Sequence, residues 1–218
     1  MSLSKLPRAE GSANTSLLSK VGLLFSIDLI AAAYGSYLGK DIQSFWALIG
    51  LVVLSFVLLF AVKIVEQANK FAGILLAAGF ALTVGLWSGP ALLHWSHVLG
   101  WQTVAFSFLG TCLAMTVFGG IGAFSGRDFS SWGPFLFQAL LGLLIFRIIL
   151  MFLPTMSGTS ILSGLAGVVL FSGYFIYDFY RAAHDANTWE NAIDHSIEIF
   201  LDFVNFLFSL LQLESKGK

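Results

Sequence analysis

Two aspartates in the last third of the chain, Asp178 and Asp202, lie in sequence that is otherwise apolar. Asp178 closes the run GLAGVVLFSGYFIYD, and Asp202 lies inside SIEIFLDFVNFLFSLLQ. A carboxylate within lipid-length apolar sequence costs about 3 kcal/mol on insertion scales, so it normally faces the interior of a helix bundle or a water-filled path. The two residues therefore indicate a functional site inside a membrane.

Other polar residues continue from Asp202 along one helical face. Five polar residues of segment 196–213 are spaced four, three, four and three positions apart, which places them on one side of an α-helix. We call this set the polar stripe, and it consists of Glu198, Asp202, Asn205, Ser209 and Gln212. In lipid, the other helices should surround such a helix, with the stripe lining their interior. The alternative is an amphipathic helix on the membrane surface, against which the scarcity of Lys and Arg argues.

The preceding apolar segment carries a matching polar face. Tyr174, Asp178 and Arg181 follow one another at spacings of four and three. Asp178 and Asp202 lie at comparable distances from the middle of the loop between them, so antiparallel helices would place them at similar depth. Poorly solvated carboxylates cannot both be ionised cheaply, so we expect this aspartate pair to share a proton and act as a pH-dependent latch. Alternatively each is satisfied separately, Asp178 by Arg181 or water and Asp202 by Asn205 or a backbone group.

Further charged residues lie in or beside apolar runs. Asp28 lies within VGLLFSIDLIAAAYG and Arg147 within LLGLLIFRIILMFLP. An ion pair between them would be the least costly arrangement, so we expect a structural Asp28–Arg147 pair. Lys63 and Glu66 lie at the edge of a run, where snorkelling or interfacial placement explains them. His195 is placed to tune the neighbouring carboxylates, although the four histidines have no tight metal-ligand spacing.

The elements that carry these residues are predicted to be membrane-spanning helices. Of the 218 residues, 57% are hydrophobic and 11% are charged, which is far from the composition of a soluble domain. A helical span needs about 20 apolar residues. Seven such runs occur, at about 21–39, 45–65, 71–93, 98–124, 132–153, 160–180 and 196–213.

The expected fold class is therefore an all-α integral membrane protein, a seven-helix transmembrane bundle around a central, polar-striped C-terminal helix. Residues 1–20 would form an N-terminal tail, 21–213 the transmembrane domain, and 214–218 a short C-terminal tail. Gly85 and Gly89 have the GxxxG spacing that permits close backbone approach between helices in lipid. Cys112 is the only cysteine, so an intrachain disulfide is excluded.

Charge distribution gives an expected orientation. The N-terminal segment has no signal-peptide pattern, so the first span should also serve as the targeting signal. The positive-inside rule favours a cytoplasmic N-terminus and an external C-terminus. Seven basic residues would lie inside and three outside, namely Lys5, Arg8, Lys20, Lys63, Lys70, Arg127 and Arg181 against Lys40, Lys216 and Lys218. A re-entrant final segment that returns the C-terminus to the cytoplasm is the alternative. No basic patch indicates a nucleic-acid partner.

Four segments together resemble a known family. They are LIAAAYGSYLG, GFALTVGLWSGPAL, YFIYDFYRAAH and IDHSIEIFLDFVNFLFSLL. They are similar to the transmembrane Bax inhibitor motif family, also called the Bax inhibitor-1 family, and the similarity extends from about Leu18 to Leu213. The most specific part is YD in the sixth span, followed some two dozen residues later by LDF.

This resemblance implies a seven-helix bundle with a central final helix, a pH-sensitive calcium leak, and a di-aspartyl pH sensor at the positions of Asp178 and Asp202. Bacterial relatives include a modulator of a membrane protease, and eukaryotic relatives reside in internal membranes and suppress cell death. Some bacterial members hold the sensor with a basic residue late in the second span. This chain has AVKIVEQANK there, so the candidate latch residues are Lys63, Lys70, Arg181 and Arg147.

The leading functional prediction is a proton-gated calcium leak channel or exchanger. The aspartate pair would gate it and offer weak Ca²⁺ ligands, and the ion path would be lined by Tyr174, Glu198, Asn205 and Ser209. Ca²⁺ and H⁺ would be the transported species, and no cofactor is expected. The alternative is a regulator that binds another membrane protein, such as a protease or a cell-death factor.

Catalysis is not expected. Intramembrane aspartyl proteases resemble YD in one span and GxGD in the next, whereas the second aspartate here has the context FLDF, and no GxSG motif of a serine site occurs. A chain this short, without retention signals or long tails, looks bacterial. We therefore expect the bacterial inner membrane, or internal membranes if the source is eukaryotic.

Overall fold

The computed structural model describes residues 13–152 and 157–215, and within these ranges it is a bundle of long α-helices. The helices are α1 (Thr15–Gly39), α2 (Phe45–Val65), α3 (Lys70–Leu99), α4 (Trp101–Phe124), α5 (Trp132–Phe152), α6 (Ser157–His184) and α7 (Trp189–Glu214). Seven helices in the described residues are long and apolar enough to cross a membrane. The predicted all-α, seven-helix membrane fold is confirmed.

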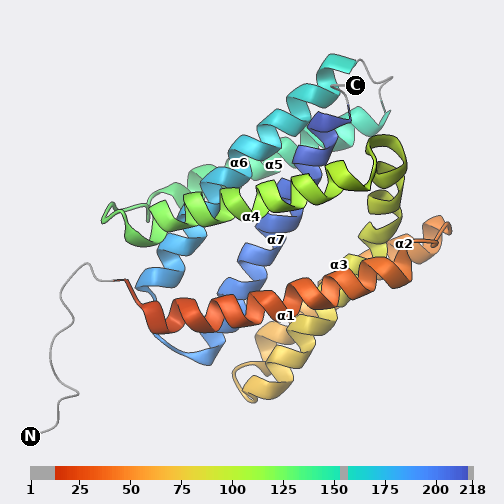
Figure 1. The fold of residues 1–218 in the computed structure, drawn as a ribbon. Helices are drawn as coiled ribbons and strands as arrows, with labels where there is room; N and C mark the ends of the chain where they lie inside the picture. The colour runs from red at the N-terminus through yellow and green to blue at the C-terminus, as the bar shows by residue number, and fades with distance from the viewer. Residues whose placement is uncertain (1–12, 153–156, 216–218) are drawn as a thin grey trace, which may run out of the picture.

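The C-terminal helix α7 lies in the middle of the bundle, with α1, α2 and α3 on one side and α4, α5 and α6 on the other (Figure 1). It contacts α1, α3, α4 and α6. Its Phe200 and Phe203 rings are completely or almost completely buried. Because α7 is enclosed by other helices over its length, it is neither a surface helix nor a short re-entrant segment.

Polar side chains that precede the apolar runs cap the N-terminal ends of helices. Asn14 Oδ1 accepts a hydrogen bond from the Leu17 backbone amide at 3.2 Å, and Thr188 Oγ1 accepts one from the Asn191 backbone amide at 3.1 Å. Each bond satisfies one of the amides that have no partner in the first helical turn. The Asn14 cap starts α1 at Thr15, inside the segment assigned to the N-terminal tail. Residues 1–12 and 216–218 of the expected tails lie outside the described residues.

Glycines let α1 and α3 pack backbone against backbone. A Cβ atom on Gly35 would overlap the Leu82 carbonyl, and one on Gly85 would overlap the Ala32 carbonyl. Gly89 likewise lies against the backbone of α1, at Ser36. The close approach predicted from the Gly85 and Gly89 spacing is therefore present, and α1 is the partner helix.

One end of the bundle gathers the α6–α7 turn, the start of α1 and the α4–α5 loop. The Asn14 amide donates to the Ala183 carbonyl at 2.7 Å, and the Tyr180 hydroxyl donates to Asp128 Oδ1 at 2.9 Å. Since the spans alternate in direction, the α2–α3 connection lies at this end too (Figure 1). We call it the loop end, and the opposite end the far end.

Candidate functional site

The site begins with the pairing of α6 and α7 across a short connection. Only residues 185–188 separate the two helices, so they run antiparallel and pack along each other. The turn is held by the Thr188 cap and by Asn14, whose Nδ2 donates to the Asp185 carbonyl at 3.1 Å. This fixed turn sets the depth at which residues of α6 meet residues of α7.

Asp178 and Asp202 meet between these helices. They are 4% and 6% exposed, and their carboxyl groups lie within hydrogen-bonding range of each other. Two carboxyl groups can form such a bond only if one of them carries a proton. Asp202 Oδ2 is buried and has no hydrogen-bond partner among the described residues. The structure therefore brings together the pair that helical spacing and loop counting predicted.

Arg181 is the basic residue next to the aspartate pair. Its Nη1 atom lies 2.9 Å from Glu198 Oε2 on α7 and 3.7 Å from Asp178 Oδ1 on its own helix. Glu198 is the first residue of the polar stripe, so the guanidinium joins the stripe to the helix that carries Asp178. Of the candidate latch residues, Arg181 is the one that contacts a member of the pair.

His195 connects the same network to the α6–α7 turn. Its side chain is almost completely buried, with Nδ1 3.1 Å from Glu198 Oε2 and Nε2 2.9 Å from Asp185 Oδ2. The expected proximity of His195 to the carboxylates is present. Asp185 was missed by sequence reasoning because a carboxylate in a polar loop gives no signal of its own.

A cavity of about 570 Å³ lies against the aspartate pair. We call it the polar cavity, and its polar lining residues are Tyr174, Tyr177, Asp178, Arg181, Glu198, Asp202 and Asn205. Tyr174, Glu198 and Asn205, which were predicted to line an ion path, thus line this cavity together with the aspartate pair; their role in an ion path stays a prediction. Ser209 and Gln212 of the polar stripe are not among the lining residues.

The expected ion pair between Asp28 and Arg147 is not formed, and that prediction was wrong. Asp28, on α1, is 2% exposed and interacts with Ser196 of α7, and its Oδ2 atom has no hydrogen-bond partner among the described residues. Arg147, on α5, donates instead to the hydroxyls of Ser163 and Ser209. The two charges belong to opposite halves of the bundle, with α7 between them (Figure 1).

Lys63, one of the candidate latch residues, contacts an acidic residue outside the aspartate pair. It forms an ion pair with Asp194, one helical turn before Glu198 on α7. Glu66, which was expected at the interface, is 4% exposed. Burial and the negative charge of Asp194 raise the pKa of Glu66 to about 7. Asp194 was missed, although its spacing of four from Glu198 extends the polar stripe by one turn.

The described residues hold no group of three or more His, Cys, Asp or Glu side chains arranged to bind a metal ion. The carboxylate and amide oxygens around the polar cavity are of the chemical type that hard cations prefer as ligands. A role of Asp178 and Asp202 as Ca²⁺ ligands stays a prediction.

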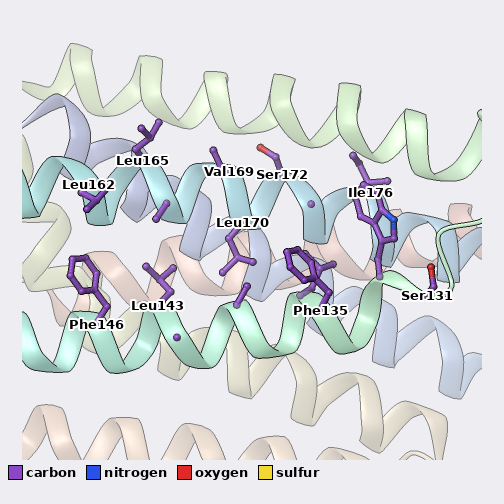
Figure 2. Close-up of a pocket in the computed structure, with 16 residues that line it drawn as sticks. Ser131, Phe135, Leu143, Phe146, Leu162, Leu165, Val169, Leu170, Ser172 and Ile176 are labelled. Carbon is purple, nitrogen blue, oxygen red and sulfur yellow. The ribbon is translucent and has the colours of Figure 1, made fainter.

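A second cavity, of about 1100 Å³, lies between α5 and α6 and has a different character. Figure 2 shows its lining side chains, which are almost entirely apolar, with Leu143 and Phe146 on α5 and Leu170 on α6 pointing into the space between the two helices. A cavity with this lining offers no oxygen ligands to a cation. The polar cavity is therefore the better candidate for an ion path.

Comparison with known proteins shows which family the chain resembles. A sequence profile described as "Inhibitor of apoptosis-promoting Bax1" matches residues 14–217. An uncharacterized protein of Borreliella burgdorferi is 28% identical over 214 residues, with 89% of each chain covered.

Two eukaryotic relatives match over part of their length. Protein LIFEGUARD 4 of Arabidopsis thaliana is 29% identical over 142 residues, which cover 63% of this chain and 52% of the relative. Bax inhibitor 1 of Schizosaccharomyces pombe is 30% identical over 135 residues, which cover 62% and 48%. The matched region thus spans about half of the length of these relatives. Since the profile covers nearly the whole chain and all its helices, the protein belongs to the Bax inhibitor-1 family of integral membrane proteins.

Proposed function

We propose that this protein is a pH-sensitive calcium leak channel or exchanger gated by the aspartate pair. The observation that carries the proposal is the contact between Asp178 and Asp202, two buried carboxyl groups within hydrogen-bonding range at the wall of a polar cavity. A structural helix contact does not need two carboxyl groups in this arrangement. A proton-dependent closure does.

In the closed state, one proton lies between the two carboxyl groups, and Arg181 holds Asp178 and Glu198 from the side. Loss of that proton leaves two negative charges in contact. At a separation of about 4 Å and an effective dielectric constant of about 20, such charges repel by about 4 kcal/mol. This repulsion is enough to shift the equilibrium between two packings of α6 against α7.

The ion path is formed by residues that face the same cavity. Asp178, Asp202 and Glu198 supply carboxylate oxygens, and Asn205 and Tyr174 supply an amide and a hydroxyl. Hard cations such as Ca²⁺ prefer these oxygen ligands. Proton loss from the pair would therefore open the contact and create a cation site in a single step.

The test is calcium flux into liposomes that contain the purified protein, measured across a range of pH. Wild-type flux should rise with pH, because deprotonation opens the contact. Asp178→Asn and Asp202→Asn should each flatten this dependence, because an amide cannot share the gating proton. Asp41→Asn, at an exposed carboxylate of the α1–α2 connection, is the matched control and should retain the wild-type profile. Unchanged flux and pH dependence in both cavity variants would sink the proposal.

A regulatory function is the second candidate. It is favoured by the description of the matched profile as an inhibitor of an apoptosis-promoting protein and by the name Bax inhibitor 1 of the yeast relative. In this role the chain would bind and restrain another membrane protein, such as a protease or a cell-death factor. It predicts co-purification with that protein from native membranes and no intrinsic flux in liposomes.

We further propose a bacterial inner-membrane location with the loop end in the cytoplasm. Support comes from the basic residues at the ends of elements that meet there, namely Lys20, Lys63, Lys70, Arg127 and Arg181. A reporter that is active only in the cytoplasm should be active when it is fused after Arg127. An inactive fusion of that reporter, together with activity of a periplasm-specific reporter at the same position, would contradict the orientation.

A further inference from the structure

Arg147 reaches from α5 to α7 across the intervening helix α6. Its Nη2 atom donates to Ser209 Oγ on α7 at 2.8 Å, and its Nε atom donates to Ser163 Oγ on α6 at 3.4 Å. Both serines are fully buried. An arginine in the apolar sequence of α5 is thus bound to the fourth residue of the polar stripe.

Gly167 on α6 provides the opening through which the guanidinium passes. A Cβ atom at this position would lie 2.7 Å from Arg147 Nη2 and would also overlap Ser209 Oγ. Any side chain there would displace the contact between α5 and α7. The absence of a side chain at Gly167 is therefore what allows Arg147 to reach the polar stripe.

The charge of Arg147 is not neutralised by an ion pair in the part of the chain that the structure describes. The ion pairs there involve Lys63, Arg181 and His195. Two neutral hydroxyls solvate the Arg147 guanidinium and leave its positive charge in place. A fixed positive charge inside a membrane protein repels cations along any path that passes it.

Arg147 also lies where the polar cavity stops. Asp202 and Asn205 line the cavity, whereas the next residue of the stripe, Ser209, is bound to the guanidinium. Going along α7 from the loop end to the far end, a cation would meet carboxylate and amide oxygens first. It would then meet Arg147.

We propose that Arg147 closes the far end of the cation path, by occupying Ser209 of the polar stripe and by repelling cations that have entered the polar cavity. This proposal rests on the proposed function, and it adds a second barrier in series with the aspartate pair. Passage of Ca²⁺ requires the guanidinium to leave Ser209. The barrier depends on charge, so it differs from a contact that only joins helices.

Calcium flux in proteoliposomes tests whether the positive charge of Arg147 limits the passage of cations. Arg147→Gln should raise the flux roughly threefold to tenfold at the pH where the wild-type protein is most active, which corresponds to a modest fall in the barrier. The pH midpoint should not move, because the aspartate pair is intact. Arg147→Lys keeps the positive charge and should stay close to the wild-type flux. Equal flux in the Gln, Lys and wild-type proteins would overturn the proposal, even if the two aspartate variants behave as expected.

Thiol labelling tests the closure without reference to calcium. In a Cys112→Ser background, Asn205→Cys places one thiol in the polar cavity. A membrane-impermeant thiol reagent applied from the far end should react slowly with this protein and clearly faster when Arg147→Gln is added. Labelling from the loop end should be equal in both, which also shows that both proteins are folded. Equal labelling rates from the far end would contradict the closure, whatever the flux assay shows for the proposed function.

Discussion

At the scale of single residues, Glu66 and Asp194 form a second close contact between acidic side chains, apart from the aspartate pair. They lie at the loop end, where Lys63 compensates part of their charge and Glu190 adds to it. Glu66 Oε2 is buried and has no hydrogen-bond partner among the described residues. This pair links the end of α2 to α7, so its protonation state affects how firmly α2 is held.

The raised pKa of Glu66, about 7, predicts a pH-dependent effect on stability. A carboxyl whose pKa is higher in the folded than in the unfolded protein stabilises the fold while it is protonated. That stability is lost as the pH rises through the folded pKa. Glu66→Gln should therefore raise the folding stability at pH 8 by on the order of 1 kcal/mol, which appears as a higher thermal midpoint. At pH 5 the same substitution should change the midpoint little.

Differential scanning fluorimetry in detergent at the two pH values measures this effect. The exposed control Asp41→Asn should shift the midpoint by a similar small amount at both values. A Glu66→Gln variant that is no more stable than wild type at pH 8 would show that the buried carboxyl carries no such penalty.

The positions of the candidate-site residues were predictable from the sequence where helical periodicity alone determines which residues share a face. A spacing of three and four placed Glu198, Asp202 and Asn205 on one face, and the short α6–α7 turn fixed the depth of Asp178. Contacts between helices distant in sequence were not predictable. Mid-span charges give depth but not the neighbour, so Arg147 was paired with the wrong partner.

At the scale of elements, close backbone packing joins α1 to α3 along a line of glycines. Gly35 and Gly85 each leave room for a carbonyl of the opposite helix. In lipid this contact depends on shape and dispersion, because there is no water to exclude. The GxxxG spacing predicted a close contact but could not name α1 as the partner, since several spans contain small residues.

Gly85→Ala tests this packing. The added methyl would overlap the Ala32 carbonyl, so we expect a loss of about 1–3 kcal/mol in folding free energy, typical of overpacked sites. Gly79→Ala is the matched control, because it lies on the same helix with nothing within 4 Å of the new Cβ. It should be neutral or gain up to about 1 kcal/mol from helix propensity. Reversible unfolding in mixed micelles measures both, and equal stability of the two variants would contradict a tight α1–α3 contact.

At the scale of the whole molecule, two sets of three helices enclose α7, and each set supplies different side chains that contact it. The α4–α6 set supplies Asp178, Arg181 and Arg147, which contact the polar stripe. The α1–α3 set supplies Lys63, which pairs with Asp194 one turn before the polar stripe, and Asp28, which interacts with a serine on another face of α7. Hydropathy predicted the seven spans and their order, because each span needs only about 20 apolar residues. The division into two sets depends on side-chain packing, which hydropathy does not encode.

The central claim is that one shared proton between Asp178 and Asp202 controls cation flux. Infrared difference spectroscopy of the protein in lipid, in a Glu66→Gln background that removes the other carboxyl expected to titrate near pH 7, should show a protonated-carboxyl band that disappears with rising pH and is missing when Asp202→Asn is added. The account predicts that this band and the calcium flux change with the same pH midpoint. A flux that changes with pH while the band stays constant, or a band that titrates at a clearly different pH from the flux, would contradict it.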